Sequence, residues 1–382
     1  MAAERKEAAM GWKRVTIMSQ RLEFVTLALK GDVAFSELCC RFEISRKTGY
    51  KFVKRYREEG MQGLCDRSRR PKISPNATPV RMEQLILDLR DERPAWGGRK
   101  LKRRVEDMGY EGVPSPSTIT EILKRNGKIS LEESEKRKAW QRFEAQRPND
   151  LWQMDFKGHF AVRDGRCHPL TVLDDHSRYA LCVGACENER KESVEGRLRD
   201  VFRRYGLPYA ILTDNGSPWG RDGIHRHTLL TVWLMRLGIE VVHSRVCHPQ
   251  TLGKDERFHR TMSAEVVPDC RDRSMTECQK LFDRWRVVYN TERPHESLGM
   301  KVPADCYHLS ERVFPERLQE WEYSPSDVVR KVQDGGIVHY KGREWRVSNA
   351  FKGQRVGIRP AGEDGRLNVF FCNFKIAEIS FL

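Results

Sequence analysis

The sequence predicts a multidomain protein in which all-α helix-turn-helix units come first, an α/β core with a mixed sheet follows, and a small β-barrel ends the chain. Three observations support this: basic pairs of short helices before residue 130, alternating strand and helix patterns from Asp150, and short alternating runs split by glycine turns in the last ~55 residues. The chain has 382 residues, of which 39% are hydrophobic, so it can bury several cores and wholesale disorder is excluded.

The first helical unit is predicted within residues 1–70. Helical patterns run through residues 18–60, and Ser45 is placed to cap a second short helix by accepting a bond from its first turn. Two short helices joined by a tight turn indicate a helix-turn-helix, whose second helix enters the DNA major groove. Plain packing of two amphipathic helices is the alternative, but the second helix is basic. Its candidate DNA contacts are Arg46, Lys47, Tyr50, Lys51 and Lys54.

A second helix-turn-helix unit is predicted over residues 71–130. Gly97-Gly98-Arg99-Lys100 opens one helix, and Arg99 and Lys100 are its candidate DNA contacts. Ser115 is the expected N-cap of the next helix, with Pro116 at its first position. The charged stretch over residues 131–148 is then expected to be a linker helix.

The α/β core is predicted over residues 149–310. Leu151 to Phe160 has the alternation of a strand, with Gln153 and Asp155 on its polar side. Further strands and helices alternate after it, and an apolar stripe at helical spacing is interpreted as core. That stripe consists of Met275, Cys278, Leu281, Phe282, Trp285, Val288 and Tyr289. The β-barrel is predicted over residues 320–382.

Charge indicates a polyanionic partner. Lys and Arg number 69 against 54 Asp and Glu, which gives +15. Residues 1–150 carry +11, residues 151–320 carry +1 and residues 321–382 carry +3. Clustered cations gain affinity by releasing counterions from phosphates, so double-stranded DNA is the expected partner, and a merely solvated basic face is the alternative.

Cysteine usage and hydropathy indicate a protein of the reducing cytosol. Eleven Cys without a CxxC pair favour free thiols over disulfides or a zinc site. No apolar run is long enough to cross a membrane, and the first residues lack the apolar stretch of a secretory signal. A cytoplasmic protein without a membrane partner or zinc is therefore expected.

Three acidic residues are candidates for a metal site. Asp155 lies within a strand, Asp214 ends an apolar strand, and Glu256 lies where a glycine-containing loop becomes a helix. Carboxylates gathered at strand ends suit Mg²⁺, which prefers oxygen ligands. Taken singly, Asp214 is equally a turn former and Glu256 a surface residue. Asp255 is a rival ligand, but a helix turns ~100° per residue, so only one of the two faces the site.

Four ordered motifs join Asp155 in a recognisable pattern. They are Leu173-Asp-Asp-His-Ser-Arg-Tyr, Leu212-Thr-Asp-Asn-Gly-Ser, Gln250-Thr-Leu-Gly-Lys-Asp-Glu-Arg-Phe-His-Arg-Thr and Tyr289-Asn-Thr-Glu-Arg-Pro-His-Glu-Ser-Leu. Together they resemble the retroviral-integrase-like core of insertion-sequence transposases over about residues 150–305. Two features depart from that pattern: 41 residues separate Asp214 from Glu256, and Leu252 stands where relatives often have Asn.

The resemblance implies an RNase-H-like fold and a catalytic metal triad of Asp155, Asp214 and Glu256. It implies a transposase in which Mg²⁺, or Mn²⁺ in its place, activates water to cut DNA, after which the freed 3′-OH joins target DNA. The substrates would be the terminal repeats and the target. Joining two ends requires a homo-oligomer of at least two copies on DNA. The retroviral His/Cys zinc module is not in the sequence, so no zinc is expected.

Cations beside Glu256 are candidate contacts for terminal DNA phosphates, with simple surface solvation as the alternative. They are Lys254, Arg257 and Arg260. The main rival function is a sequence-specific DNA-binding regulator with an inactive integrase-like core. A structure-selective nuclease on the same fold is the second rival. Two DNA-reading units favour the transposase, because a general nuclease needs no sequence address.

Overall fold

The computed structural model describes residues 16–67, 77–129, 144–220, 227–243, 253–361 and 365–380. The chain divides into two compact units, Met1–Ala77 and Thr78–Leu382, and each is described by itself. Most of the linker helix expected over 131–148 lies outside the described residues, and residues 144–148 are not helical. Leu252 also lies outside them. No helix among the described residues has the length and hydropathy to cross a membrane.

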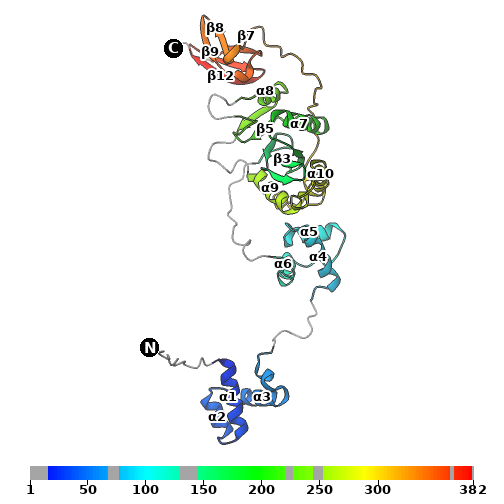
Figure 1. Ribbon diagram of the computed structural model, residues 1–382, viewed down its shortest axis with the longest axis vertical. Helices are drawn as coiled ribbons and strands as arrows, with labels where there is room; N and C mark the ends of the chain where they lie inside the picture. Colours follow the sequence, from blue (N-terminus) through cyan, green and yellow to red (C-terminus); the bar gives the residue numbers. More distant parts are fainter. Residues whose placement is uncertain are drawn as a thin grey trace, which may run out of the picture. The chain divides into compact units, whose positions relative to one another are not determined.

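In the described part of the first unit, helices pack around a small apolar core, and Figure 1 shows their arrangement. Ser45 caps the third helix, because its hydroxyl accepts from the Thr48 backbone N–H at 3.2 Å, as the sequence predicted. Gly49 permits close packing, since a Cβ there would lie 2.9 Å from the Phe24 ring. The elements are α1 (Ile17–Lys30), α2 (Phe35–Arg41), α3 (Arg46–Glu59) and the short 3₁₀ helix η1 (Gly60–Leu64).

The second unit begins with three more helices: α4 (Val80–Glu92), α5 (Gly98–Asp107) and α6 (Pro116–Arg125). The predicted cap at Ser115 is confirmed, because its hydroxyl accepts from Thr118 N–H at 3.2 Å. Trp96 and Leu101 are buried in the core that these helices share.

A mixed sheet forms the centre of this unit. β1 pairs with β3 in antiparallel fashion and with β5 in parallel fashion, while β6 extends the parallel side and β4 pairs with the other edge of β3. The predicted α/β core with a mixed sheet is therefore confirmed. The strands are β1 (Leu151–Phe156), β2 (Phe160–Val162), β3 (Gly165–Asp174), β4 (Ala180–Cys186), β5 (Ala210–Thr213) and β6 (Glu240–His243).

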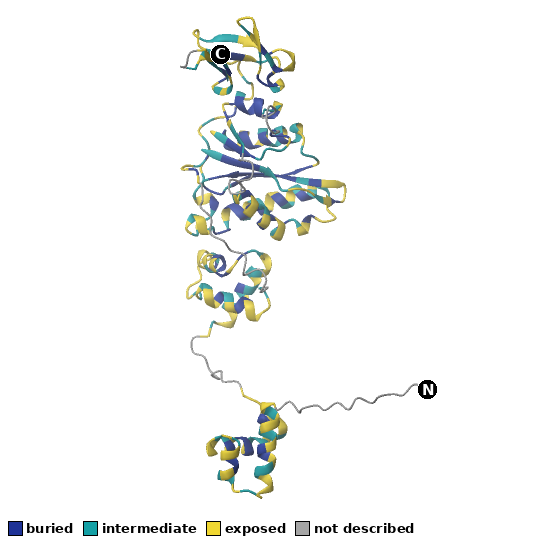
Figure 2. Ribbon diagram, turned by 90° about the vertical axis from the view of Figure 1, so that its left-hand side faces the viewer, coloured by how far each residue is buried: buried dark blue, intermediate teal, exposed yellow. Residues whose placement is uncertain are grey.

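Helices cover both faces of this sheet. α7 (Lys191–Tyr205) and α8 (Leu229–Arg236) share one core with it, and α9 (Gly253–Glu265) and α10 (Met275–Thr291) share the other. Figure 2 shows the buried strands in dark blue between the helices. The α10 stripe is core as predicted, since Cys278, Phe282, Trp285 and Tyr289 are buried.

The C-terminal region forms two antiparallel sheets, of which the larger has the order β12-β11-β10-β7 and the smaller pairs β8 with β9. The sequence predicted a β-barrel, but the described strands do not close into one sheet. The apolar core of this region extends to Val232 and Met235 of α8. The strands are β7 (Val328–Lys331), β8 (Ile337–Tyr340), β9 (Arg343–Arg346), β10 (Arg355–Pro360), β11 (Arg366–Phe371) and β12 (Phe374–Ser380).

Candidate active site at the edge of the central sheet

Asp155 and Asp214 lie at matching positions on neighbouring parallel strands. β1 and β5 pair with Gln153 beside Leu212, and each aspartate stands two residues further along its strand direction. β5 has ended by then, so Asp214 begins the loop after it. The carboxyl ends of parallel strands are where ligands bind in α/β sheets. The fold thus brings two of the three predicted triad residues together.

The Asp155 carboxyl is poised between its protonated and charged forms. Burial, together with the nearby charges of Asp214 and Glu189, raises its pKa to about 7. The backbone N–H of Phe156 donates to Asp155 Oδ1 at 2.8 Å, and this hydrogen bond partly offsets the rise in pKa. A carboxylate held among like charges gains most from a bound cation.

Asp214 is held by the loop that it starts. Gly216 N–H donates to Asp214 Oδ1 at 3.0 Å. A Cβ on Gly216 would lie 3.0 Å from Asp214 Oδ2, so a glycine lets the backbone close onto the carboxylate. His243, at the end of β6, has Nδ1 3.1 Å from the Asp214 carbonyl oxygen. This His243 contact was not predicted from the sequence.

The first turn of α9 directs its two adjacent carboxylates differently. Asp255 is fully buried, and neither of its oxygens has a hydrogen-bond partner among the described residues. Burial raises the Asp255 pKa well above its ordinary value, with further contributions from Asp155 and Asp175. Glu256 is 69% exposed at its side chain and forms an ion pair with Arg260 at 3.3 Å. Helical periodicity predicted that only one carboxylate faces inward, and in this structure it is Asp255.

His259, one turn further along α9, approaches the site. Its Nε2 lies 2.8 Å from the Thr171 hydroxyl, which donates to the Asp155 carbonyl oxygen at 2.9 Å. Burial, together with the charge of Lys157, lowers the His259 pKa to about 4, so the imidazole is neutral at pH 7. His259 belongs to the sequence motif around Glu256, but the role of its partner Thr171 was not predicted from the sequence.

The donor set suits a hard divalent cation. Two neighbouring carboxylates at a strand edge present oxygen ligands and negative charge, which Mg²⁺ and Mn²⁺ match. Within the part of the chain that the structure describes, no cluster of three or more His, Cys, Asp or Glu is arranged to hold a metal. Asp155 and Asp214 are therefore suited to bind a divalent cation as a pair. Glu256, the predicted third ligand, does not join them in this structure.

The candidate DNA contacts of α3 form one exposed face. Arg46, Lys47, Tyr50, Lys51 and Lys54 are all exposed and recur at helical spacing. The ring of Tyr50 is 61% exposed and stacks on Phe35 with ring centroids 4.2 Å apart. This face presents four cations and an aromatic ring from a helix whose opposite side is core.

The two candidate contacts of α5 differ in exposure, because the Arg99 side chain is 71% exposed whereas Lys100 is buried. Arg99 forms an ion pair with Glu296 at 3.6 Å, and Arg104 one with Glu292 at 2.9 Å. Lys100 is buried, and burial together with the charge of Arg293 lowers its pKa to about 7. A lysine in this position presents no ammonium to solvent.

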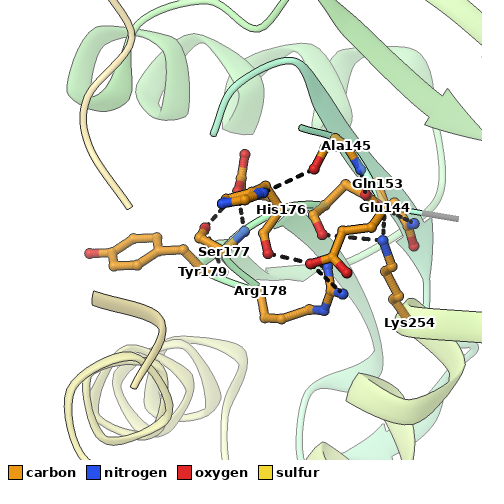
Figure 3. Close-up of polar contacts among 10 residues, drawn as sticks. Glu144, Ala145, Gln153, His176, Ser177, Arg178, Tyr179 and Lys254 are labelled. Carbon is orange, nitrogen blue, oxygen red and sulfur yellow. Dashed lines mark hydrogen bonds and ion pairs between the residues drawn. The ribbon is translucent and has the colours of Figure 1, made fainter. Parts of the chain in front are cut away.

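The cations of α9 also differ from one another. Arg257 and Arg260 are exposed. Lys254 instead has its Nζ 2.5 Å from Asp175 Oδ1, and its side chain is only 17% exposed. Figure 3 shows the surrounding polar network, which joins Lys254 to Gln153 of β1, to residues 144–145 and to the turn between β3 and β4.

Comparisons with known families match the chain in five segments. A helix-turn-helix domain matches residues 20–72, and a homeodomain-like domain matches residues 48–123. Two integrase core domain models match residues 145–249 and 237–303. The C-terminal domain of the IS481 family transposases matches residues 327–381. These segments follow the order of the helical units, the sheet and the C-terminal strands.

Several curated relatives are proteins of bacterial mobile elements. An uncharacterized 39.2 kDa protein of insertion element IS476 from Xanthomonas euvesicatoria is 29% identical over 41% of this chain and 44% of its own length, so this match spans less than half of that protein. A putative transposase of IS5376 from Geobacillus stearothermophilus is 22% identical over 91% of this chain and 84% of its own. The transposase of Tn552 from Staphylococcus aureus is 22% identical over 97% and 82%.

Solved structures of viral integrases are distant neighbours. The HTLV-2 integrase catalytic core domain in complex with magnesium is 17% identical, and the match covers 43% of this chain and 99% of that one with a TM-score of 0.34. A chain of the simian T-cell lymphotropic virus intasome in complex with PP2A regulatory subunit B56 gamma is 13% identical, with 78% and 96% covered and a TM-score of 0.38.

Proposed function

We propose that this chain, an insertion-sequence transposase with an integrase-like core, binds the terminal repeats of its mobile element, cuts the phosphodiester at each end and joins the freed 3′-OH to target DNA. The family resemblance rests on the transposase and integrase core matches together. The cutting and joining steps, and the residues that perform them, are the proposal.

The juxtaposition of Asp155 and Asp214 is the observation that carries it. Two carboxylates stand side by side at the carboxyl end of parallel strands, inside the segment that matches an integrase core. Their mutual repulsion and partial burial favour a bound divalent cation over two free charges. A purely DNA-binding regulator has no use for such a pair.

Asp155, Asp214 and Glu256 would hold Mg²⁺, or Mn²⁺ in its place. When bound, the metal supplies a Lewis acid that lowers the pKa of water and neutralises charge on the phosphate. The chain's own residues then position the reacting groups: Asp214 is fixed by Gly216, and Asp155 by the strand and by its backbone bond to Thr171. Positioning is a major part of catalysis in phosphoryl transfer.

Glu256 is proposed as the third ligand although its carboxylate is paired with Arg260 here. The pair is exposed and spans one helical turn, so it is worth only about 0.3–0.5 kcal/mol and yields readily to a metal and DNA. Asp255 is the competing ligand on the same turn. Its buried carboxylate lies near Asp155, so the two assignments are tested against each other below.

End recognition is assigned to the exposed face of α3. Its cations and Tyr50 suit a major-groove contact, with Arg and Lys reading base edges or positioning on phosphates. Arg257 and Arg260 on α9 are proposed to contact terminal phosphates close to the reacting end. Synapsis of two element ends requires at least two copies of the chain on DNA.

Labelled element-end DNA, purified full-length protein and Mg²⁺ provide the test. We expect a nick that frees a 3′-OH at the terminal repeat, followed by joining to an unlabelled target, and neither reaction on a scrambled end. Specific binding to the repeat without nicking in Mg²⁺ or Mn²⁺ would instead establish the regulator with an inactive core. Nicking of any branched or random DNA would indicate a nuclease.

A further inference from the structure

The carboxylate of Asp175 joins three segments of the core. It lies in the turn between β3 and β4 and is 1% exposed. One oxygen accepts from the backbone N–H of Ala145 at 2.7 Å, and the other from the Gln153 amide at 2.6 Å and the Lys254 ammonium at 2.5 Å. All three donors come from different elements (Figure 3).

Lys254 contacts Asp175 twice. Besides the ion pair, its Nζ donates to the Asp175 carbonyl oxygen at 3.2 Å. Arg178 in the same turn pairs with Glu144 at 3.2 Å, which ties the turn to the segment before β1. The Lys254 ammonium therefore lies in the interior, and the Lys254 side chain is only 17% exposed. It is poorly placed to reach a DNA phosphate.

Both ends of this connection lead to proposed metal ligands. Gln153 is two residues before Asp155 on β1, and Lys254 is two residues before Glu256 on α9. The Asp175 carboxylate therefore sets how the first turn of α9 lies against β1. Asp255 sits between Lys254 and Glu256, and its carboxylate has no hydrogen-bond partner among the residues that the structure describes, so the Lys254 pair is a polar anchor of this turn.

We propose that Lys254, through Asp175, is a positioning residue that fixes the first turn of α9 against β1, the strand that carries Asp155, and that it does not contact DNA. This inference rests on the proposed function. It replaces the sequence-based assignment of Lys254 to DNA phosphates, while Arg257 and Arg260 keep that role. A positioning residue affects metal use and reaction rate, whereas a phosphate contact affects binding and its dependence on salt.

The experiment compares Lys254→Met and Asp175→Asn with wild type in the full-length chain. Lys191→Met is the matched control, because Lys191 also pairs with a carboxylate, Glu195 at 3.4 Å, on α7, which packs in the other core from α9. Three quantities are measured: the dissociation constant for end DNA with its salt slope, the single-turnover joining rate, and the Mg²⁺ concentration for half-maximal rate.

We expect both site variants to bind end DNA within about twofold of wild type, with an unchanged salt slope. Their joining rate should fall about 100-fold, the effect of a ~1 Å misplacement. The half-maximal Mg²⁺ concentration should rise about tenfold, as for loss of a residue that orients a ligand. The double variant should lose no more than either single variant, since both act through one pair. Lys254→Arg, which keeps a cation for Asp175, should recover part of the rate.

A salt slope smaller by about one with a normal saturating rate would show that Lys254 contacts a phosphate and would overturn the inference. Loss of rate in Asp175→Asn that only follows loss of folded protein, measured by circular dichroism at the assay temperature, would overturn it as well. If Lys254→Met fails to fold, the nearly isosteric Asp175→Asn carries the test. Wild-type protein that neither nicks nor joins would refute the proposed function itself, which is a separate outcome.

Discussion

His259 Nδ1 lies 4.0 Å from Asp155 Oδ2, close enough to contact the carboxylate but too far for a hydrogen bond. Because burial keeps this imidazole neutral at pH 7, it does not cancel the charge of Asp155. The neighbouring charge of Asp214 therefore raises the pKa of Asp155 without compensation from His259, and the pH behaviour predicted below follows from that.

The stability of the metal-free chain should depend on the protonation of Asp155. Its pKa rises from 3.8 to about 7 on folding, so the folded state binds the proton more tightly than the unfolded state. The resulting stabilisation is complete below pH 3.8 and is lost as the pH rises through about 7. In EDTA, we expect Asp155→Asn to melt about 5 °C above wild type at pH 8, with a smaller gap at pH 5. Equal gaps at both pH values in thermal melts would contradict this.

The proposed triad should be essential for chemistry and dispensable for binding. Asp155→Asn, Asp214→Asn and Glu256→Gln each remove one anionic oxygen with little change of shape, so nicking and joining should fall by at least about 1,000-fold. Binding of end DNA, measured by gel shift, should stay within a few-fold. Asp200→Asn on α7 is the control, since its exposed carboxylate only pairs with Arg203. A triad variant that keeps full activity would remove that residue from the site.

Asp255→Asn separates the two carboxylates of α9. The amide removes a buried charge that has no hydrogen-bond partner among the described residues, so we expect unchanged joining activity and a higher thermal midpoint. The rate assay and melts at pH 8 measure the two effects. An inactive Asp255→Asn beside an active Glu256→Gln would move the third ligand by one residue.

Metal dependence should follow coordination geometry. After chelation, Mg²⁺ or Mn²⁺ should restore strand transfer, whereas Ca²⁺ should support DNA binding without joining. Ca²⁺ holds oxygen ligands at ~2.3–2.6 Å against ~2.0–2.1 Å for Mg²⁺, which loosens the alignment of the reacting groups. Re-adding single metals to EDTA-treated protein is the assay. Full activity in EDTA, or with zinc alone, would refute the mechanism.

Specific end binding should depend on the exposed face of α3. Replacing Arg46, Lys47 and Lys51 together with Ala in the full chain should reduce the preference for end DNA over scrambled DNA by at least about tenfold. Lys30, Arg41 and Arg57 replaced together form a control with the same charge loss on the same unit. Binding curves with end DNA and with scrambled DNA at physiological salt measure this preference. Equal loss of preference in both triple variants would assign the effect to charge alone.

Local rules predicted much of this fold. The caps at Ser45 and Ser115 follow from hydroxyl groups three residues before an orphan N–H, and the α10 stripe follows from helical period. The expected strand over Leu151–Phe160 is wrong in its length. β1 ends at Phe156, and Gly158 with a φ of +86° turns the chain before the separate strand β2.

The orientation of charged side chains was not predictable in the same way. Helical period shows that Asp255 and Glu256 diverge, but which one faces inward depends on how α9 packs on β1. Lys254 is inward because its partner Asp175 stands 79 residues earlier in the chain. Lys100 is buried for a similar reason, since α5 lies against the segment that follows α10. Such long-range pairs leave no local pattern.

The pairing of α5 with Glu292 and Glu296 bears on how the chain's binding to DNA responds to ionic strength. A cation that already neutralises a protein carboxylate releases no counterion from DNA unless that pair first breaks. Arg104 and Lys254, whose side chains are only 27% and 17% exposed, are occupied in this way, so the count of 69 Lys and Arg overstates the cations available to phosphates. The affinity for DNA will therefore fall less steeply with added salt than a count of Lys and Arg suggests, and α3 will account for a large share of the dependence.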